Sequence, residues 1–376
     1  MDFNYECIEC RKCEENCSIF IATGKYSPLE KLKIIDDLRN DLEINDEQIQ
    51  TIFNCTKCEA CESACPQEIP LMDLFDWARH KIQTSFGLRN QKQLYLINNI
   101  VNTGNPFGQE ESRLKGVPSE LLKEKMDYEF KPLKSKILLH LGCMLGYRLH
   151  SMRDDVLNLF NLLEIDYTLL RDENCCGYFI WNTGDHKTAR DIIQKNSEVF
   201  DQYDKIICAC AGCYTFFKEH YPHNEKFYHS IEIIDKTLMK FKEEGRLDSK
   251  MLNEIRGKSM VFHDSCHLTR PHNIIMAPRR TMSCIGINSK EYSRSGIGGL
   301  CCGADGGLRI VNPELAVKIG IDRVKEAKEM ESDVILTLCP FCIFNFRDAT
   351  SEEEIVEVKS LYYYIHKYLK LNLKKK

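Results

Sequence analysis

The hydrophobic pattern near the start of the chain is that of helices. In the segment SPLEKLKIIDDLRNDLEINDEQIQTIFN (27–54), apolar residues recur at helical intervals. These residues are Leu29, Leu32, Ile35 and Leu38. Asp46 is placed to cap a second helix that continues to Phe53. The pattern therefore predicts a mostly helical domain over residues 1–85.

A second region, residues 86–134, shows turn signals in place of a regular apolar pattern. The stretches TGNPFG (103–108) and GVPSE (116–120) lie among charged residues, and the region contains no cysteine. We expect a linker that wraps around the domain that follows.

From residue 135 onward, short apolar runs alternate with helical stretches. KILLHLGC (136–143) and DKIICACAGC (204–213) are strand-like runs that end in cysteine, and DHKTARDIIQKNSEVFDQY (185–203) is helical. The same order recurs in KSMVFHDSC (258–266), LAVKIGIDRVKEAKEM (315–330) and SDVILTLCPFC (332–342). This indicates two repeated α/β domains, 135–256 and 257–376. The terminal LKLNLKKK (369–376) is expected to be a solvated basic tail.

Composition and charge exclude several classes of protein. With 376 residues, 43% hydrophobic and 28% charged, the chain is typical of a soluble multidomain protein rather than a disordered one. The net charge of −5 argues against a nucleic-acid partner. No apolar run is long enough to span a bilayer, and the start MDFNYECIEC lacks a secretion signal. We expect a cytoplasmic protein, attached to a membrane only through a partner.

Cysteine is far more abundant than packing requires, with 20 residues. The cysteines cluster at intervals of two and three residues, which a disulfide framework has no reason to do. This spacing favours metal binding.

The first two cysteine groups share the spacing C-x2-C-x2-C-x3-C, and Pro66 follows the second group. In two-cluster ferredoxins the fourth cysteine of each group binds the neighbouring cluster. We therefore assign one [4Fe–4S] cluster to Cys7, Cys10, Cys13 and Cys65. The other is assigned to Cys17, Cys55, Cys58 and Cys61. Zinc is the alternative, but a zinc site has no use for a third cysteine in each group.

The remaining cysteines form one set of five in each α/β repeat. The first set is Cys143, Cys175, Cys176, Cys210 and Cys213, and the second is Cys266, Cys301, Cys302, Cys339 and Cys342. The gaps agree closely, with 31 and 34 residues before the adjacent pair and 33 and 36 after it. Five thiols exceed what zinc or a cubane requires, which points to an unusual cluster. A strained disulfide within each adjacent pair and simple core packing are the alternatives.

The motifs around these cysteines resemble those of the CCG-domain iron–sulfur proteins. FHDSCHLTR, GLCCGADGGLR and TLCPFCIFN are similar to the CCG domain, and ENCCG with CAGCY to a second copy of it. The long helical insert between the first two groups resembles the helical ferredoxin domain of fumarate reductase and succinate dehydrogenase iron–sulfur subunits. Ser18 stands where that family usually has a second proline.

The whole layout is most similar to the D subunit of CoB–CoM heterodisulfide reductase. The superfamily also includes glycolate oxidase and anaerobic glycerol-3-phosphate dehydrogenase C iron–sulfur subunits. The resemblance implies a multidomain α+β protein: a helical ferredoxin domain with two cubane [4Fe–4S] clusters, then two pseudo-repeated α/β CCG domains. It also implies that each complete five-cysteine set holds a noncubane [4Fe–4S] cluster, and that the two clusters face each other across a disulfide site.

The function implied is that of an anaerobic oxidoreductase of the kind used in methanogenesis. Electrons would pass through the cubane clusters to a catalytic subunit that reduces a CoM-S-S-CoB type heterodisulfide at the noncubane pair. The alternative is an electron-transfer subunit of a flavoprotein 2-hydroxy acid or glycerol-3-phosphate dehydrogenase. No G-x-G-x-x-G fingerprint follows a strand. A partner is therefore expected: a b-type cytochrome, a flavoprotein, or a hydrogenase or formate dehydrogenase type of donor.

Two histidines flank Cys266 in the sequence HDSCH. His263 and His267 could each donate to a cluster sulfur or a substrate thiolate, or be satisfied by backbone groups. His267 is the candidate proton donor. Cys208 and Cys284 fall outside the sets and are interpreted as structural. Four glycines around the second CCG motif suggest tight packing near metal: Gly298, Gly299, Gly306 and Gly307.

Overall fold

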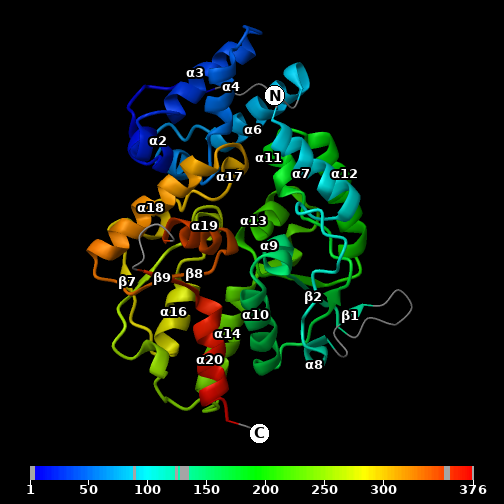
Figure 1. The fold of residues 1–376 in the computed structure, drawn as a ribbon, viewed down its shortest axis with the longest axis vertical. Coiled ribbons are helices and arrows are strands. Elements are labelled where there is room, and N and C mark those ends of the chain that lie inside the picture. Colours follow the sequence, from blue (N-terminus) through cyan, green and yellow to red (C-terminus); the bar gives the residue numbers. More distant parts are fainter. Residues whose placement is uncertain (1–4, 88–89, 123–125, 128–134, 351–355, 375–376) are drawn as a thin grey trace.

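The computed structural model describes residues 5–87, 90–122, 126–127, 135–350 and 356–374. A helical N-terminal part lies at the top of Figure 1, above two α/β halves that stand side by side. Among the described helices, none is long and apolar enough to cross a membrane.

The N-terminal part is helical, as predicted from its apolar spacing. Its helices are α1 (Lys12–Glu15), α2 (Ser18–Thr23), α3 (Pro28–Arg39), α4 (Asp46–Phe53), α5 (Ala60–Ser63) and α6 (Leu71–Phe86). Ser27 caps α3 by accepting hydrogen bonds from the backbone N–H groups of Leu29 and Glu30. The predicted cap of α4 was wrong by one residue. Asn45 is the N-cap and forms a capping box with Gln48, while Asp46 is the first helical residue.

The predicted linker contains regular elements that its turn signals did not indicate. These elements are the helices α7 (Gln91–Thr103) and α8 (Ser119–Leu122) and the short strand β1 (Met126–Asp127). Asn90 caps α7, and Ile97 and Ile100 bury one face of α7 in the core of the α/β halves. Residues 88–89, 123–125 and 128–134 of the predicted linker lie outside the described residues.

The first α/β half is built on parallel strands. They are β2 (Ile137–His140), β3 (Leu169–Leu170), β4 (Lys205–Cys208) and β5 (Phe227–His229). β2, β4 and β5 form a sheet in the order β2-β4-β5, while β3 pairs with β1 and joins β2 through a bridge between Leu138 and Thr168. The connecting helices are α9 (Gly142–Tyr147), α10 (His150–Leu162), α11 (Tyr178–Asn182), α12 (His186–Phe200), α13 (Ala211–His220) and α14 (Ser230–Glu243), with a 3₁₀ turn η1 (Asn224–Lys226).

The second half repeats this order. Its parallel strands are β6 (Met260–Phe262), β7 (Lys290–Glu291), β8 (Val334–Thr337) and β9 (Glu357–Ser360), arranged β7-β6-β8-β9. Its helices are α15 (Cys266–Thr269), α16 (Met276–Cys284), α17 (Leu308–Val311), α18 (Pro313–Glu329), α19 (Pro340–Thr350) and α20 (Leu361–Asn372), with 3₁₀ turns η2 (Asn253–Ile255) and η3 (Gly296–Gly298). The strand-like runs ending in cysteine are β2, β4, β6 and β8, so the predicted repeated α/β fold is confirmed.

The two halves exchange their last helices. α14 of the first half packs on α16 of the second, and α20 of the second half packs on α10 of the first (Figure 1). An ion pair between Asp235 and Arg280 supports the first contact, and a 2.8 Å hydrogen bond between His366 and Asp155 supports the second. One continuous apolar core consequently spans both halves.

The prediction of a solvated tail holds for only part of 369–374, where Lys370, Leu371 and Lys374 are exposed but Leu369 and Asn372 are buried. Leu369 is fully buried in α20, and Leu373 forms an antiparallel bridge with Leu247. Apolar residues at a helical spacing carry this segment into the core, and the basic end at 375–376 lies outside the described residues.

Candidate metal centres

Two groups of four thiols converge in the helical part. One cavity is lined by Cys7, Cys10, Cys13 and Cys65, which we call the outer site. A second cavity, the inner site, is lined by Cys17, Cys55, Cys58 and Cys61. The fourth cysteine of each sequence group thus lies with the three cysteines of the other group. Cys10 of the outer site is exposed, whereas Cys61 of the inner site is buried.

The backbone around both sites fits an anionic cluster. Glu9 and Arg11, on either side of Cys10, adopt left-handed φ angles of 51° and 60°. Lys57 and Glu59 repeat this around Cys58, with φ angles of 53° and 63°. Alternation of left-handed residues turns backbone N–H groups toward one point and creates an anion-binding nest. Four thiols and a nest of N–H groups form a donor set suited to a [4Fe–4S] cluster.

The first five-cysteine set lies at the carboxyl ends of the strands of the first half. Cys143 follows β2, the Cys175–Cys176 pair follows β3, and Cys210 and Cys213 follow β4. Carboxyl ends of parallel strands share one edge, so loops distant in sequence meet there. Neighbouring thiols interact in the order Cys143, Cys175, Cys176, Cys213, Cys210. All five are buried.

The second set repeats this arrangement at the edge of the other sheet. Cys266 follows β6, the Cys301–Cys302 pair follows β7, and Cys339 and Cys342 follow β8. The glycine after each adjacent pair has a left-handed φ, 95° at Gly177 and 90° at Gly303. An added Cβ at Gly303 would lie 2.4 Å from the carbonyl oxygen of Ala316. Glycine is therefore required at this turn.

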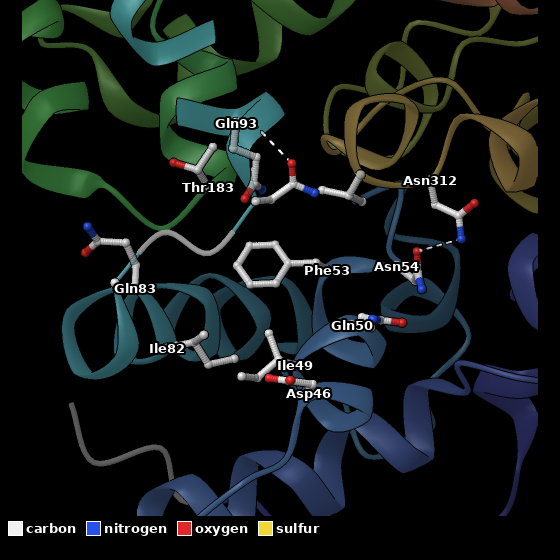
Figure 2. A pocket seen from close by; sticks show the side chains of 13 residues that line it. Asp46, Ile49, Gln50, Phe53, Asn54, Ile82, Gln83, Gln93, Thr183 and Asn312 are labelled. Carbon is white, nitrogen blue, oxygen red and sulfur yellow. Dashed lines mark hydrogen bonds between the residues drawn. The ribbon is translucent and has the colours of Figure 1, made fainter. Parts of the chain in front are cut away.

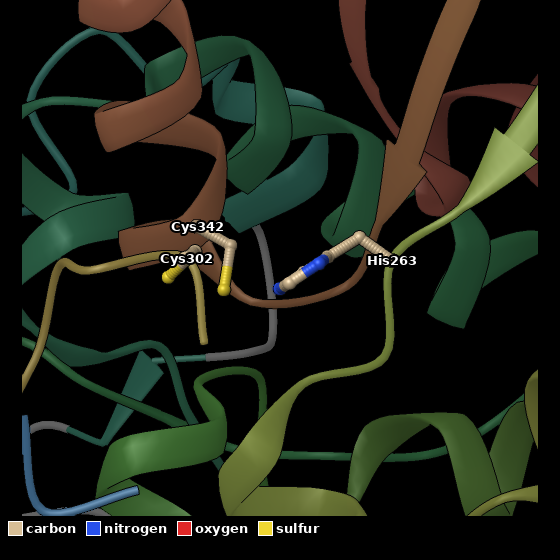
Figure 3. Close-up of side chains that lie close together, drawn as sticks. All are labelled: His263, Cys302 and Cys342. Atoms are coloured by element: carbon tan, nitrogen blue, oxygen red, sulfur yellow. The ribbon is translucent and has the colours of Figure 1, made fainter. Parts of the chain in front are cut away.

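The two sets differ in the histidine that lies three residues before their first cysteine. In the second set, a ring nitrogen of His263 and the sulfurs of Cys302 and Cys342 lie within 4.8 Å of one another (Figure 3). In the first set, the equivalent His140 lies 3.5 Å from Glu173. Burial lowers the pKa of His263 to about 3 and that of His140 to about 4. Both rings are therefore neutral at pH 7.

A buried ion pair fixes the loop that carries Cys143. The carboxylate of Glu173 accepts hydrogen bonds of 2.9 Å from the backbone N–H groups of Leu141 and Gly142. It also pairs with Arg113 at 2.5 Å. Sequence reasoning missed both residues. The one available signal was that Glu173 lies two positions before Cys175, whereas nothing in the linker marked Arg113.

His267 lies where the two cysteine sets meet. Its Nε2 is 3.3 Å from the hydroxyl of Tyr178 and 3.1 Å from a carboxylate oxygen of Asp305. Tyr178 follows the first CCG motif and Asp305 follows the second, so the histidine contacts both cysteine loops. Burial alone would lower the pKa of His267, but the Asp305 carboxylate raises it to about 10. The imidazole of His267 is therefore protonated at neutral pH.

The helical part docks against the second set. The thiol of Cys58, from the inner site, interacts with the thiol of Cys301. Ser18 accepts a 2.9 Å hydrogen bond from the backbone N–H of Cys301, a contact that proline at this position could not make. Arg270 donates a 2.7 Å hydrogen bond to the carbonyl of Cys58. The inner site and the second five-cysteine set are thus in direct contact.

One fully buried arginine joins all three parts of the chain. Arg79 on α6 donates to the carbonyl of Gly306 at 2.8 Å, to the side chain of Asn182 at 3.0 Å and to the carbonyl of Cys55 at 3.1 Å. Gly306 also approaches the loop of Cys55 closely, because an added Cβ would lie 2.4 Å from the carbonyl carbon of Thr56. Gly306 thus shows the tight packing predicted for the glycines around the second CCG motif, whereas an added Cβ at Gly298 would meet nothing within 4 Å and one at Gly307 would lie 3.8 Å from its nearest neighbour.

A separate cavity of about 410 Å³ lies where these three parts meet (Figure 2). Phe53, Asn54, Thr183 and Asn312 contribute to its walls, and Asn312 donates a 3.3 Å hydrogen bond to Asn54. None of the described residues lining it is a cysteine. This cavity is therefore distinct from the thiol sites, although Asn54 directly precedes Cys55.

Two domain families match the chain. The cysteine-rich domain CCG matches residues 137–218 and 260–347, and the 4Fe–4S dicluster domain matches residues 4–69. These regions contain the two five-cysteine sets and the two four-thiol sites, respectively.

Relatives are similar over nearly the whole chain at modest identity. An uncharacterized iron–sulfur protein of Methanocaldococcus jannaschii is 27% identical over 351 residues, covering 91% of this chain and 67% of the relative. In Methanosarcina barkeri, the D subunit of the dihydromethanophenazine:CoB–CoM heterodisulfide reductase is 27% identical over 380 residues, covering 93% and 91%. The EtfAB:quinone oxidoreductase of Syntrophomonas wolfei is 26% identical over 416 residues, covering 93% and 56%.

Proposed function

The chain is an iron–sulfur protein of oxidoreductase type, with one 4Fe–4S dicluster domain and two cysteine-rich CCG domains, and on this premise we propose that it reduces a disulfide. The substrate would be a heterodisulfide of the CoM-S-S-CoB type, bound between the two five-cysteine sets. The chain would act as the catalytic subunit of a complex.

The observation that carries this proposal is that two complete five-cysteine sets are present and that His267, next to Cys266 of the second set, contacts Tyr178 beside the first set. A protein that only transfers electrons needs a single series of clusters. A disulfide reductase must stabilise two sulfur atoms when the bond between them breaks. Each set offers five buried thiols, and Tyr178 and Asp305 connect the loops of the two sets through His267. A disulfide at this junction would have one set on each side.

Cleavage of a disulfide takes two electrons and two protons and yields two thiols. The clusters, two cubane and two noncubane [4Fe–4S] when bound, supply the electrons one at a time. Cys7, Cys10, Cys13 and Cys65 would hold one cubane cluster, and Cys17, Cys55, Cys58 and Cys61 the other. The five-cysteine sets would hold one noncubane cluster each. The described fold brings each of these groups of thiols together.

One of the two protons would come from His267, and the second would be taken up from solvent as the other thiolate leaves the site. Asp305 keeps a proton on its imidazole and Tyr178 orients the ring, so that one product thiolate is protonated at this junction. The buried surroundings exclude bulk water, because His267, Asp305 and Tyr178 are each less than one-tenth exposed. After each turnover, His267 would be protonated again through the polar group that it forms with Asp305 and Tyr178.

A partner protein would deliver the electrons at the outer site, whose Cys10 is exposed. The partner would be a b-type cytochrome, a flavoprotein, or a donor of hydrogenase or formate dehydrogenase type. The similarity to the EtfAB:quinone oxidoreductase favours one second candidate: an electron-transfer subunit that receives electrons from a flavoprotein dehydrogenase. In that case no disulfide would be reduced.

The test uses the full chain, purified without oxygen and with its clusters intact. Oxidation of reduced viologen is measured with CoM-S-S-CoB, with cystine and with no disulfide. We expect turnover that depends on the heterodisulfide. The artificial donor removes the need for the partner. Absence of turnover in fully loaded protein would refute disulfide reduction and favour the electron-transfer subunit.

Two histidine variants test the proton donor. His267→Gln should lose at least about 100-fold in turnover, the lower limit typical of general acid catalysis. His223→Gln changes an exposed histidine and should retain activity. Iron content is measured in both variants, so that loss of a cluster is distinguished from loss of the proton.

A further inference from the structure

A buried lysine lines only the inner of the two four-thiol sites. Lys31 on α3 is 1% exposed and contributes to the cavity formed by Cys17, Cys55, Cys58 and Cys61. Its ammonium group donates a hydrogen bond to the carbonyl of Tyr26. Within the described part of the chain, no carboxylate forms an ion pair with Lys31.

A buried ammonium without a carboxylate is costly unless another negative group compensates it. Cys17, Cys55, Cys58 and Cys61 line the same cavity as Lys31, and as thiolates holding a cluster they would supply that negative charge. The inner site therefore supplies the charge that would justify a lysine in this position.

The outer site has a different environment. Its cavity is lined by apolar residues such as Leu29, Leu32 and Ile69, and by Arg11 at its rim. The side chain of Arg11 is 73% exposed, so water screens its charge. Lys33, on the same helix as Lys31, is also exposed and lies 3.9 Å from Glu9. No described residue places a buried cation at the outer site.

From this contrast we propose that Lys31 tunes the inner site, raising the reduction potential of the cluster held by Cys17, Cys55, Cys58 and Cys61. Reduction adds one negative charge to the site, and a fixed positive charge in a medium of low dielectric constant stabilises the reduced form more than the oxidised form. The inner site is the one in contact with Cys301 of the second five-cysteine set. Lys31 thus stabilises the reduced form of the cluster that would lie beside that set.

This inference rests on cluster binding by the dicluster domain and not on the identity of the substrate. The test is a redox titration of the full chain with dye mediators, followed by electron paramagnetic resonance. Lys31→Met and Lys31→Gln remove the charge, and Gln keeps a donor for the carbonyl of Tyr26. Lys31→Arg retains the charge. Lys33→Met, two residues away, is the control for an exposed charge.

We expect the neutral variants to shift one of the two cubane signals to a lower potential. The shift should be at least about tenfold in the ratio of oxidised to reduced cluster at fixed potential, which is 59 mV for one electron. Lys31→Arg should restore the potential, and Lys33→Met should leave both signals within experimental error of the unmodified chain. A Cys10→Ala variant, which weakens the outer site, assigns the signals.

Iron and sulfide are counted in every sample, so that a missing cluster is not mistaken for a shifted one. The proposal is overturned if both neutral variants load fully and neither signal moves, or if the two signals move equally. It is also overturned if the signal of the outer site moves alone. None of these outcomes depends on disulfide reduction, so the inference and the proposed function can fail separately.

Discussion

Replacement of Gly306 by alanine should loosen the contact between the dicluster domain and the second CCG domain. Gly306 has a φ of 65°, and an added Cβ would lie 2.4 Å from the carbonyl carbon of Thr56 and 2.6 Å from the carbonyl oxygen of Cys55. These are backbone atoms, which cannot rotate away as the end of a side chain could. The loop that carries Cys55 and Cys58 would have to move.

The expected magnitude has two parts. The left-handed backbone costs an alanine about 1–2 kcal/mol. Overpacking against a fixed neighbour adds about 1–3 kcal/mol. Gly257 is a matched control, because its φ is 72° and nothing lies within 4 Å of an added Cβ. Gly257→Ala should therefore be destabilised only by the left-handed backbone conformation. The difference in stability between the two variants then reports the overpacking of Gly306→Ala against the loop of Cys55.

The assay is the midpoint of thermal unfolding of the loaded chain, combined with limited proteolysis at the domain boundary. Unfolding of a multidomain protein with clusters is not two-state, so midpoints are compared rather than converted to free energies. We expect Gly306→Ala to unfold several degrees below Gly257→Ala and to be cleaved faster between the domains. Equal midpoints and equal cleavage would refute the close packing at Thr56.

Three further outcomes are expected. Cys210→Ser should lose iron from the first CCG domain, whereas Cys208→Ser, in strand β4 and outside the five-cysteine set, should keep the full iron content measured by colorimetric assay. Tyr178→Phe should slow disulfide reduction by about tenfold or more without changing iron content, because it removes the hydroxyl 3.3 Å from His267. Burial lowers the pKa of His186 from 6.5 to about 4. The unfolded chain therefore binds an extra proton between these values, and stability falls as pH falls through this range. His186→Phe, which keeps a ring stacked on Trp181, should unfold less readily in acid than the parent chain, by thermal scans from pH 7 to 4; an identical pH dependence would contradict the neutral His186.

Local chemistry allowed much of the fold to be predicted. The strand-like runs ending in cysteine became β2, β4, β6 and β8, because a buried strand of a parallel sheet is a continuous apolar run. Their common edge then brings the thiols of each repeat together. The exchange of Cys17 and Cys65 between sites likewise follows from spacing alone, since the fourth cysteine of each group faces away from the first three.

Contacts between domains could not be predicted in this way. Tyr178 and Asp305 belong to different repeats, and their meeting at His267 depends on how the two halves pack. The same holds for Arg79, whose partners Asn182 and Gly306 are 103 and 227 residues away. The error in the predicted N-cap of α4 had a local cause. At the start of α4, two neighbouring residues could each cap the helix, and Asn45 is the one that does.

The exchange of α14 and α20 has a consequence for how this architecture can be divided. Each half covers part of the other, so a fragment ending after residue 256 would leave the apolar face of α10 in water without α20. A gene split at the repeat boundary should therefore yield two aggregating pieces when each is made alone, and a stable pair when both are made together. On this packing, we expect the two repeated halves to fold as a single unit, so that neither half is stable without the other.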